Sequence, residues 1–300
     1  MELDSVRLFV RIAELGAVGA AARDLGMSPA AASARLKRLE DSVGARLFHR
    51  TTRALALTTD GAAFLPHAQG ALDLLDQGVA TLGGGSPAPA GLLRVAMPGS
   101  FGRMHVLPGL GAFCDRYPEV RLDLRLSDEI LDVVEGAFDL VIRNAPLTDS
   151  TMIARKLAPD RRIVVASPKY VARHGAPRTP EELSQHRCVV LGDDERWLFA
   201  GRDPVAVPVS IRVNDGEASR LAVENGLGIA RKSLWNVYQA LRAGRLVRLL
   251  PDYPVDTRQA IWAGYPAQRV VAPKVRAMID FLVERFGPVP YWEDDAAVEP

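Results

Sequence analysis

The chain has 300 residues, of which 48% are hydrophobic and 24% charged, and its formal net charge at pH 7 is +1. This length and composition are typical of a globular protein with about two domains, and the balanced charge gives no general affinity for nucleic acid. The opening residues, which include Glu2 and Asp4, do not resemble a secretory signal, and charges interrupt every longer apolar stretch. We therefore expect a cytoplasmic location and no membrane partner.

The first predicted elements are two helices followed by a tight turn. Apolar residues recur at helical spacing up to Gly16, and residues 20–25 form a short helix that stops at Gly26. Ser28 followed by Pro29 then starts a third helix, because the serine oxygen caps free amides and proline fits the first helical position.

The third helix is predicted from Pro29 to about Asp41, with an apolar side and a polar side. Its inner positions are Ala32, Leu36 and Leu39, and its outer positions are Ala30, Ser33, Ala34, Lys37 and Arg38. Small side chains let a helix enter the major groove of DNA, while longer basic side chains reach the phosphates. This helix is therefore a candidate for binding double-stranded DNA.

A basic cluster follows the helix although the whole chain is nearly neutral. Between residues 35 and 53 two acidic side chains oppose six basic ones, which are Arg35, Lys37, Arg38, Arg46, Arg50 and Arg53. Residues 47–59 read as two short extended segments around residues 51–53, a wing whose arginines meet the phosphate backbone or the minor groove. A solvated basic hairpin is the alternative, which the three preceding helices disfavour.

A long helix is predicted from Thr59, and a domain boundary follows it. Its apolar stripe needs a partner, so we expect a linker helix that pairs with a second copy of the chain, with packing inside one chain as the alternative. Glycine and proline in residues 81–91 remove helix and strand propensity. The predicted domains are a DNA-binding domain at 1–59, a dimerising linker at 60–87 and an effector-binding domain at 88–300.

The second half alternates short strands with helices, as in an α/β fold. A strand at residues 92–97 leads through Pro98–Phe101 into a helix, a loop type that can hold a carboxylate or be an ordinary turn. A second strand, at 120–126, ends at Ser127 and Asp128, before a helix through Val134. A third strand ends at Arg143, which can pair with an anionic ligand or form a structural salt bridge.

A second lobe is predicted to follow. Lobe I spans about residues 91–162 and 268–288, and lobe II about 163–267; Asp215 to Glu217 lead from a strand into a helix of lobe II. A late helix near residues 273–286 has one apolar face and is expected to pack back on lobe I. Two lobes joined in this way can close over a ligand like a hinge.

The first 60 or so residues resemble the LysR-type regulators. The resemblance lies in a dense set of positions: Ala20, Ala21, Leu25, Ser28, Pro29, Ser33, Leu39, Glu40, Gly44, Leu47, Phe48, Arg50, Leu57, Thr58 and Gly61. It implies an all-α winged helix-turn-helix joined to a two-lobed α/β effector domain like that of periplasmic binding proteins. The implied partners are promoter or operator DNA, a small-molecule effector, a homodimer or homotetramer, and RNA polymerase; no cofactor is implied.

The resemblance also assigns roles to residues of the first domain. It places Ser28, Pro29, Ala30, Ser33 and Arg35 near base edges, and Lys37, Arg50, Thr51 and Arg53 on phosphates or in the minor groove. Glu40 is expected to support the fold. Many family members have arginine directly after the serine of the third helix, whereas this chain has Ala34 there and Arg35 one step later, so the base contacts do not transfer directly.

The second half resembles the effector domain of the same family. The family's pocket pattern places a group of residues around the cleft between the lobes: Ser100, Phe101, Ser127, Asp128, Arg143, Trp197, Asp215 and Gly216. Trp197 has lobe core as an equal alternative. The resemblance implies a small organic anion as effector, with which Arg143 is compatible and beside which Asp128 and Asp215 are unfavourable. Binding would reorient the lobes and rearrange the oligomer on DNA, altering polymerase recruitment.

Other classes of protein fit the sequence less well. It contains no GxSxG, GxxxxGK[ST] or HExxH motif, and its five histidines lack metal-ligand spacing, so we expect neither an enzyme nor a metal site. A stand-alone ligand-binding protein fits the second half only. Cys114 and Cys188 have no CxxC spacing; they are expected to be ordinary free thiols, with a redox-sensing regulator of the same family as the alternative.

Overall fold

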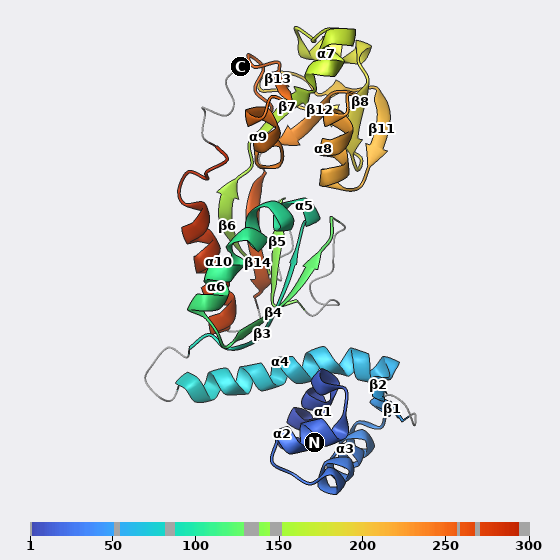
Figure 1. Cartoon of the computed structure of the whole chain (residues 1–300), viewed down its shortest axis with the longest axis vertical. Coiled ribbons are helices and arrows are strands. Elements are labelled where there is room, and N and C mark those ends of the chain that lie inside the picture. Colours follow the sequence, from blue (N-terminus) through green and yellow to red (C-terminus); the bar gives the residue numbers. More distant parts are fainter. Residues whose placement is uncertain are drawn as a thin grey trace. The chain divides into compact units, whose positions relative to one another are not determined.

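The computed structural model describes residues 2–50, 55–81, 88–128, 138–144, 152–256, 259–267 and 271–293. The chain divides into two compact units, residues 1–88 and residues 89–300. Figure 1 shows a helical first unit with a small hairpin and a second unit of mixed sheets and helices. Among the described residues, no helix combines the length and the apolar character that crossing a lipid bilayer requires.

The first unit consists of three helices, a hairpin and a long fourth helix. Its elements are α1 (Leu3–Leu15), α2 (Val18–Asp24), α3 (Pro29–Val43), β1 (Phe48–Arg50), β2 (Leu55–Leu57) and α4 (Thr59–Thr81). The two strands pair antiparallel, with Phe48 opposite Leu57. Of the apolar positions predicted for the first helix, Leu8, Phe9 and Ile12 share one buried core with the inner side of α3, whereas Leu15 at the end of α1 is 40% exposed. Helical periodicity therefore located most of this core.

Helix α4 buries the first part of its apolar stripe within its own chain. The Phe64 ring lies 5.4 Å from the Phe9 ring of α1, and Ala68 and Leu72 are buried in the same core. Further along the helix, Leu75 is 46% exposed. Packing inside one chain thus accounts for the first turns of α4, and an exposed leucine remains on a later turn.

The first lobe of the second unit is a five-stranded sheet. In sheet order its strands are β4 (Val120–Leu126), β3 (Gly91–Met97), β5 (Leu140–Arg143), β14 (Ala260–Pro266) and β6 (Met152–Pro159). Strand β3 is parallel to β4 and β5, whereas β14 is antiparallel to β5 and β6. Leu93, Val95 and Met97 are buried on one face of β3 and Ala96 on the other, which explains why β3 reads as a nearly continuous apolar run.

Helical segments follow β3 and cover the sheet. After β3 come α5 (Gly99–Phe101), the π turn η1 (Gly102–Val106), the 3-10 turn η2 (Leu107–Gly109) and α6 (Leu110–Arg116). Helix α10 (Pro273–Phe286) lies beside α6 in Figure 1, and the ring centroids of Phe113 and Phe281 are 5.4 Å apart. The late helix therefore packs on the first lobe, as its apolar face predicted.

The second lobe occupies the chain between β6 and β14. Strand β7 (Arg162–Ala166) pairs antiparallel with β12 (Ala230–Ser233) and β13 (Val247–Leu249), and β8 (Cys188–Leu191) is parallel to β11 (Val209–Val213). The remaining elements are α7 (Pro168–His174), η3 (Pro180–Gln185), β9 (Arg196–Trp197), β10 (Val205–Ala206), α8 (Gly216–Glu224) and α9 (Leu234–Arg242).

The predicted end of the second lobe at residue 267 is wrong. Strand β14 is hydrogen-bonded between β5 and β6 in the first-lobe sheet. The chain leaves this sheet after Pro159 and returns at Ala260, and these two residues lie opposite each other. Periodicity identifies a strand but not its neighbours, so the sequence could not place β14. The helix predicted through Val134 lies outside the described residues.

Candidate functional site

Helix α3 presents a face of small and basic side chains. The Ser28 hydroxyl caps its start by accepting a hydrogen bond from the Ala31 amide at 3.2 Å, and Pro29 occupies the first turn. With 3.6 residues per turn, Ala30 and Lys37 lie opposite the buried side of the helix, and both are exposed. A duplex could approach this face without displacing core residues.

Arg35 lies at the flank of this face. Its guanidinium is 3.7 Å from the Asp4 carboxylate of α1, and its side chain is 28% exposed. Ser33, on the opposite flank, is exposed. Of the residues predicted near base edges, those at the amino-terminal end of α3 are therefore accessible, whereas Arg35 is partly buried and ion-paired within the chain.

Glu40 joins α3 to the start of the hairpin. Its side chain is 4% exposed, and its Oε1 accepts hydrogen bonds from the amides of Leu47 at 2.9 Å and Phe48 at 3.4 Å. Its Oε2 accepts from Arg46 Nη1 at 3.0 Å. A buried carboxylate needs such partners, and these fix where β1 begins relative to α3.

The start of α4 holds the hairpin from the other side. The Thr58 amide donates to the Leu47 carbonyl at 3.0 Å, and the Thr58 hydroxyl donates to the Arg46 carbonyl at 2.6 Å. A Cβ on Gly61 would lie 2.0 Å from the Leu47 carbonyl oxygen, so this approach of two backbones requires glycine. Five positions of the family resemblance thus build the base of one hairpin: Glu40, Leu47, Phe48, Thr58 and Gly61.

Three of the predicted DNA contacts fall within residues 50–53, from the last residue of β1 onward. Arg50 ends β1, with its backbone opposite Leu55. Thr51 and Arg53 lie outside the described residues. The roles of these three side chains at DNA stay predictions.

A cavity of about 440 Å³ lies between the two lobes of the second unit. That volume suits a small organic molecule. Its walls come from the ends of β3, β4 and β5 in the first lobe, and from β7, β12 and the starts of α8 and α9 in the second. Five of the residues predicted to contact a ligand line it, namely Ser100, Ser127, Asp128, Arg143 and Gly216.

Two residues predicted at the cleft are core residues instead. Phe101 is fully buried, with its ring centroid 5.2 Å from that of Trp235 and 5.7 Å from that of Phe286. Trp197 is 1% exposed and belongs to a hydrophobic core of the second lobe that includes Tyr170 and Phe199. Its Nε1 donates to the Asp194 carbonyl at 3.0 Å. These two predictions are corrected, because each side chain turns toward apolar neighbours that come from distant parts of the chain.

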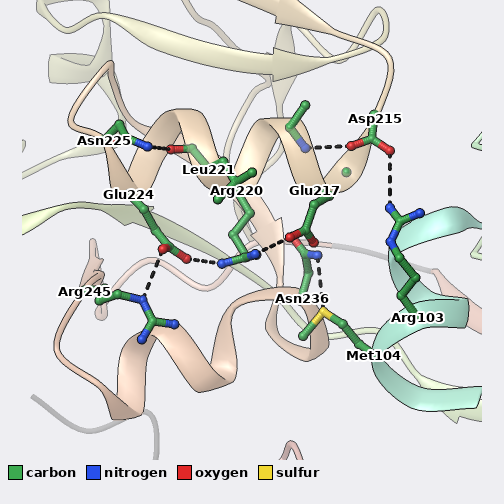
Figure 2. Close-up of polar contacts among 12 residues, drawn as sticks. Arg103, Met104, Asp215, Glu217, Arg220, Leu221, Glu224, Asn225, Asn236 and Arg245 are labelled. Atoms are coloured by element: carbon green, nitrogen blue, oxygen red, sulfur yellow. Dashed lines mark hydrogen bonds and ion pairs between the residues drawn. The ribbon is translucent and has the colours of Figure 1, made fainter. Parts of the chain in front are cut away.

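Asp215 caps α8 and contacts the other lobe. Its carboxylate accepts a hydrogen bond from the Ala218 amide at 2.6 Å, and it lies 3.7 Å from the guanidinium of Arg103 in η1, an ion pair that Figure 2 shows. In the same view Asn236 of α9 donates to the Met104 sulfur of η1 at 3.8 Å. Asp215 does not line the cavity, so its predicted contact with a ligand is corrected to a positioning role.

The cavity holds more basic side chains than the sequence pattern indicated. Four basic residues line it, Arg143, Arg162, Arg231 and Lys232, against three acidic ones, Asp128, Asp193 and Asp194. Asp194 forms ion pairs with both Arg231 and Arg162. The three unpredicted cations are in β7 and β12, and a signal for two of them was present: consecutive basic residues inside the apolar run 229–235.

Lys232 is buried in the wall of the cavity. It is 4% exposed, and its Nζ donates to the Gly216 carbonyl at 2.9 Å. Within the described part of the chain, no carboxylate lies at ion-pair distance from this Nζ. Burial, together with the nearby charges of Arg162 and Arg220, lowers the pKa of Lys232 to about 7.

Asp128 connects the two lobes across the cavity. Its Oδ1 accepts from the Gly99 amide of the first lobe at 2.6 Å, and its Oδ2 accepts from the Gly216 amide of the second lobe at 2.7 Å. A Cβ on Gly216 would lie 2.8 Å from Ser100 Oγ, so the lobes approach closely here. One carboxylate thus bonds the start of a helical segment in each lobe.

The two cysteines lie in different lobes. Cys114 is exposed on α6, and Cys188 is buried in β8, where burial raises the pKa of its thiol to about 12. The described residues contain no group of three or more His, Cys, Asp or Glu side chains arranged to hold a metal ion.

Comparisons with known proteins cover nearly the whole chain. The family model described as "Bacterial regulatory helix-turn-helix protein, lysR family" matches residues 3–62, and that described as "LysR substrate binding domain" matches residues 86–287. An HTH-type transcriptional regulator of Xanthomonas campestris is 36% identical over 296 residues, which are 95% of this chain and 85% of that protein. The regulator DmlR of Escherichia coli is 34% identical over 291 residues, 95% of this chain and 94% of that protein.

A solved structure extends this similarity to the fold. The structure of CrgA, a LysR-type transcriptional regulator from Neisseria meningitidis, has a TM-score of 0.61 and 31% sequence identity. The similarity covers 95% of this chain and 98% of that chain.

Proposed function

Because this chain belongs to the LysR family of transcription regulators, we propose that α3 and the hairpin bind a specific operator and that a small organic anion in the cavity controls transcription. One observation supports both operator binding and control by an anion. The same chain carries an exposed helix face of small and basic residues and a cavity lined by four basic side chains. Residues 1–59 are assigned to DNA binding, 60–87 to the dimerising linker and 88–300 to effector binding.

In the DNA-bound protein, the amino-terminal end of α3 enters the major groove. Ser28, Pro29, Ala30 and Ser33 lie near base edges there, and Lys37 reaches a phosphate. Arg50, Thr51 and Arg53 contact phosphates or the minor groove. Arg35 contacts a base edge once its ion pair with Asp4 opens. Selection of bound fragments from the protein's own upstream region would test this assignment.

Lys37→Ala is expected to weaken operator binding about three- to tenfold, by a similar factor for every sequence. A phosphate contact carries no base information, and its loss lowers the slope of log affinity against log salt by about one. Binding isotherms at several salt concentrations measure both effects. The matched control is Lys169→Ala, which removes an exposed lysine of α7; equal isotherms for Lys37→Ala and wild type would contradict the placement of α3.

The organic anion binds between the lobes, with its charge toward the basic side chains of β5, β7 and β12. Binding changes the relative orientation of the lobes, and the oligomer then changes the spacing or bend of bound DNA and so the recruitment of RNA polymerase. A panel of small organic acids, titrated against an operator footprint, tests this step. An acid that binds with no change in the footprint would count against it.

The proposed regulator is a homodimer or homotetramer in the cytoplasm. Leu75, exposed on α4, supports a contact between two copies of this helix. Sedimentation measures the oligomeric state of wild type and Leu75→Asp. A smaller oligomer for the variant would support pairing of two α4 helices, and an unchanged oligomer would support packing within one chain.

Replacing both cysteines by serine is expected to leave operator binding unchanged under reducing conditions and after peroxide treatment. With the pKa of Cys188 near 12, its thiolate is scarce at neutral pH, and the thiolate is the reactive form. Operator binding by Cys114→Ser and Cys188→Ser, each with and without peroxide, measures this. A peroxide response in the wild type that one variant loses would favour the redox-sensing regulator.

A further inference from the structure

Asp128 occupies a position in the cavity that is suited to an anion. Backbone amides from two lobes, those of Gly99 and Gly216, converge on its carboxylate at 2.6 and 2.7 Å. Hydrogen bonds to an ionised acceptor are stronger than neutral ones, so this pair of donors favours a negative group between them. In this chain that negative group is a side chain of the protein.

Helix capping alone does not explain the position of Asp128. Helix α8 already has its own cap, since Asp215 accepts from the Ala218 amide at the same helix start. The Asp128 carboxylate, which accepts from the Gly216 amide, belongs to the other lobe and is 88 residues away from Gly216 in sequence. The absence of a side chain at Gly216 lets α8 come close to Ser100 and Asp128. The junction is therefore built around this carboxylate.

Two charged side chains of the cavity bond the backbone of Gly216. Lys232 donates to the carbonyl of Gly216, and Asp128 accepts from the amide of the same residue. The remaining basic residues of the cavity are Arg143 in β5, Arg162 in β7 and Arg231 in β12, and the last two form ion pairs with Asp194. A ligand carboxylate placed beside Asp128 would meet a like charge and amides that are already bonded, whereas a donor group would meet the unused lone pairs of the carboxylate.

We propose that Asp128 is a specificity-determining residue of the cavity: its carboxylate fills the anion position between the two lobes, so the effector presents a hydrogen-bond donor at this end and its own negative charge at the other. This inference rests on the proposed function, because it assumes that the cavity holds the effector. It narrows the effector class to organic anions that carry a hydroxyl, amide or ammonium group remote from the charged group.

The test uses formate, which has the size of the group that Asp128→Ala removes. Full-length Asp128→Ala is expected to melt at a lower temperature than wild type, and formate is expected to restore much of the loss with saturable binding. Calorimetric titration should show at least about tenfold tighter formate binding by the variant than by wild type. Comparable saturable binding of formate by wild type would overturn the proposal, as would a folded Asp128→Ala protein that binds no formate.

Two further variants serve as controls. Asp215→Ala removes a carboxylate at the same helix start, but one that does not line the cavity, and should show no saturable rescue by formate. Asp128→Asn keeps the size of the side chain but has only one acceptor oxygen, so either the Gly99 amide or the Gly216 amide would face a donor, and that amide should exchange hydrogen faster. This second variant replaces Asp128→Ala if the latter does not fold, and unchanged exchange would then overturn the proposal.

The formate experiment involves neither DNA nor effector. Its failure would leave operator binding and the Lys37→Ala result untouched, and it would remove only the assignment of Asp128. Failure of operator binding, with formate rescue intact, would instead remove the proposed function and leave a carboxylate that bridges two lobes.

Discussion

Lys232→Met is expected to raise the free energy of unfolding at pH 7 by about 3 kcal/mol. Burial holds the pKa of Lys232 at about 7 in the folded protein, against 10.5 ordinarily. At about 1.4 kcal/mol per pH unit, keeping this lysine buried costs about 4 kcal/mol at pH 7. Methionine has a similar length and no charge, and it forfeits only the hydrogen bond to Gly216, worth about 1 kcal/mol.

The advantage of Lys232→Met depends on pH in a fixed direction. Between about pH 7 and 10.5 the unfolded chain holds a proton on Lys232 that the folded chain does not, so the stability of wild type rises with pH in this window. The difference between variant and wild type is therefore largest at pH 7 and below, and it shrinks toward pH 10. Denaturant unfolding of both proteins at pH 7, 8 and 9 measures the difference, in which the other titrating groups cancel.

Lys274→Met is the matched control, because it replaces a lysine of similar burial in a different environment. Lys274 is 3% exposed, lies 3.6 Å from the Asp139 carboxylate, and donates to the Leu92 carbonyl at 2.5 Å. Removing this cation takes the ion-pair partner from the Asp139 carboxylate, which keeps its hydrogen bond from the Arg94 amide, and should lower stability by about 2 kcal/mol. Shifts of the same sign for the two lysine variants would show that partners do not decide the cost of burial here.

Lys232 destabilises the protein and lines its cavity, and we infer from this that it contributes to effector binding. Stabilising substitutions at functional positions commonly reduce activity. We therefore expect Lys232→Met to respond less to any organic acid that acts on wild type, while operator binding without effector stays the same.

Glu40→Ala is expected to lower the stability of the first unit by about 3 kcal/mol and to abolish specific operator binding. The loss comes mainly from the Leu47 and Phe48 amides, which would be left without their acceptor in a buried place. The ion pair with Arg46 adds little, since the Arg46 side chain is 64% exposed and water screens it. Urea unfolding and fragment binding of the same preparation measure both effects.

Neighbouring substitutions separate the role of the acceptor from that of charge. Glu40→Gln keeps an oxygen that can accept from the amides, so it should lose less stability than Glu40→Ala. Asp41→Ala removes the same charge from an exposed position on the next residue and should change stability by less than about 0.5 kcal/mol. Equal losses for all three would mean that the charge of α3, and not the anchoring of β1, is what matters.

Local signals predicted the first unit well because its structure depends on neighbours in sequence. The Ser28–Pro29 helix start and the buried side of α3 each depend on residues within a few positions, although α3 runs on to Val43, two residues past its predicted end. The helix start at Asp215 and the positions of strands β3 and β4 along the chain follow the same logic. These features need no knowledge of the rest of the chain.

The cavity was predicted less completely because distant segments build it. Phe101 and Trp197 were assigned by position in a pattern, and only the packed structure shows that both face apolar neighbours. Lys232 and Arg162 reach the cavity through the pairing of β12 with β7, which no local signal specifies. Asp128 was assigned correctly to the cavity lining, but its bonds to both lobes were not foreseeable.

A ribosome releases β5 and β6 about 100 residues before the strand that separates them in the sheet. Until β14 emerges, β5 keeps an unpaired edge and β6 has no neighbour, so the second lobe must be made while the first is incomplete. Unpaired strand edges invite association with other chains. The nascent protein is therefore expected to complete its DNA-binding unit early and to need the most chaperone protection during synthesis of residues 160–260.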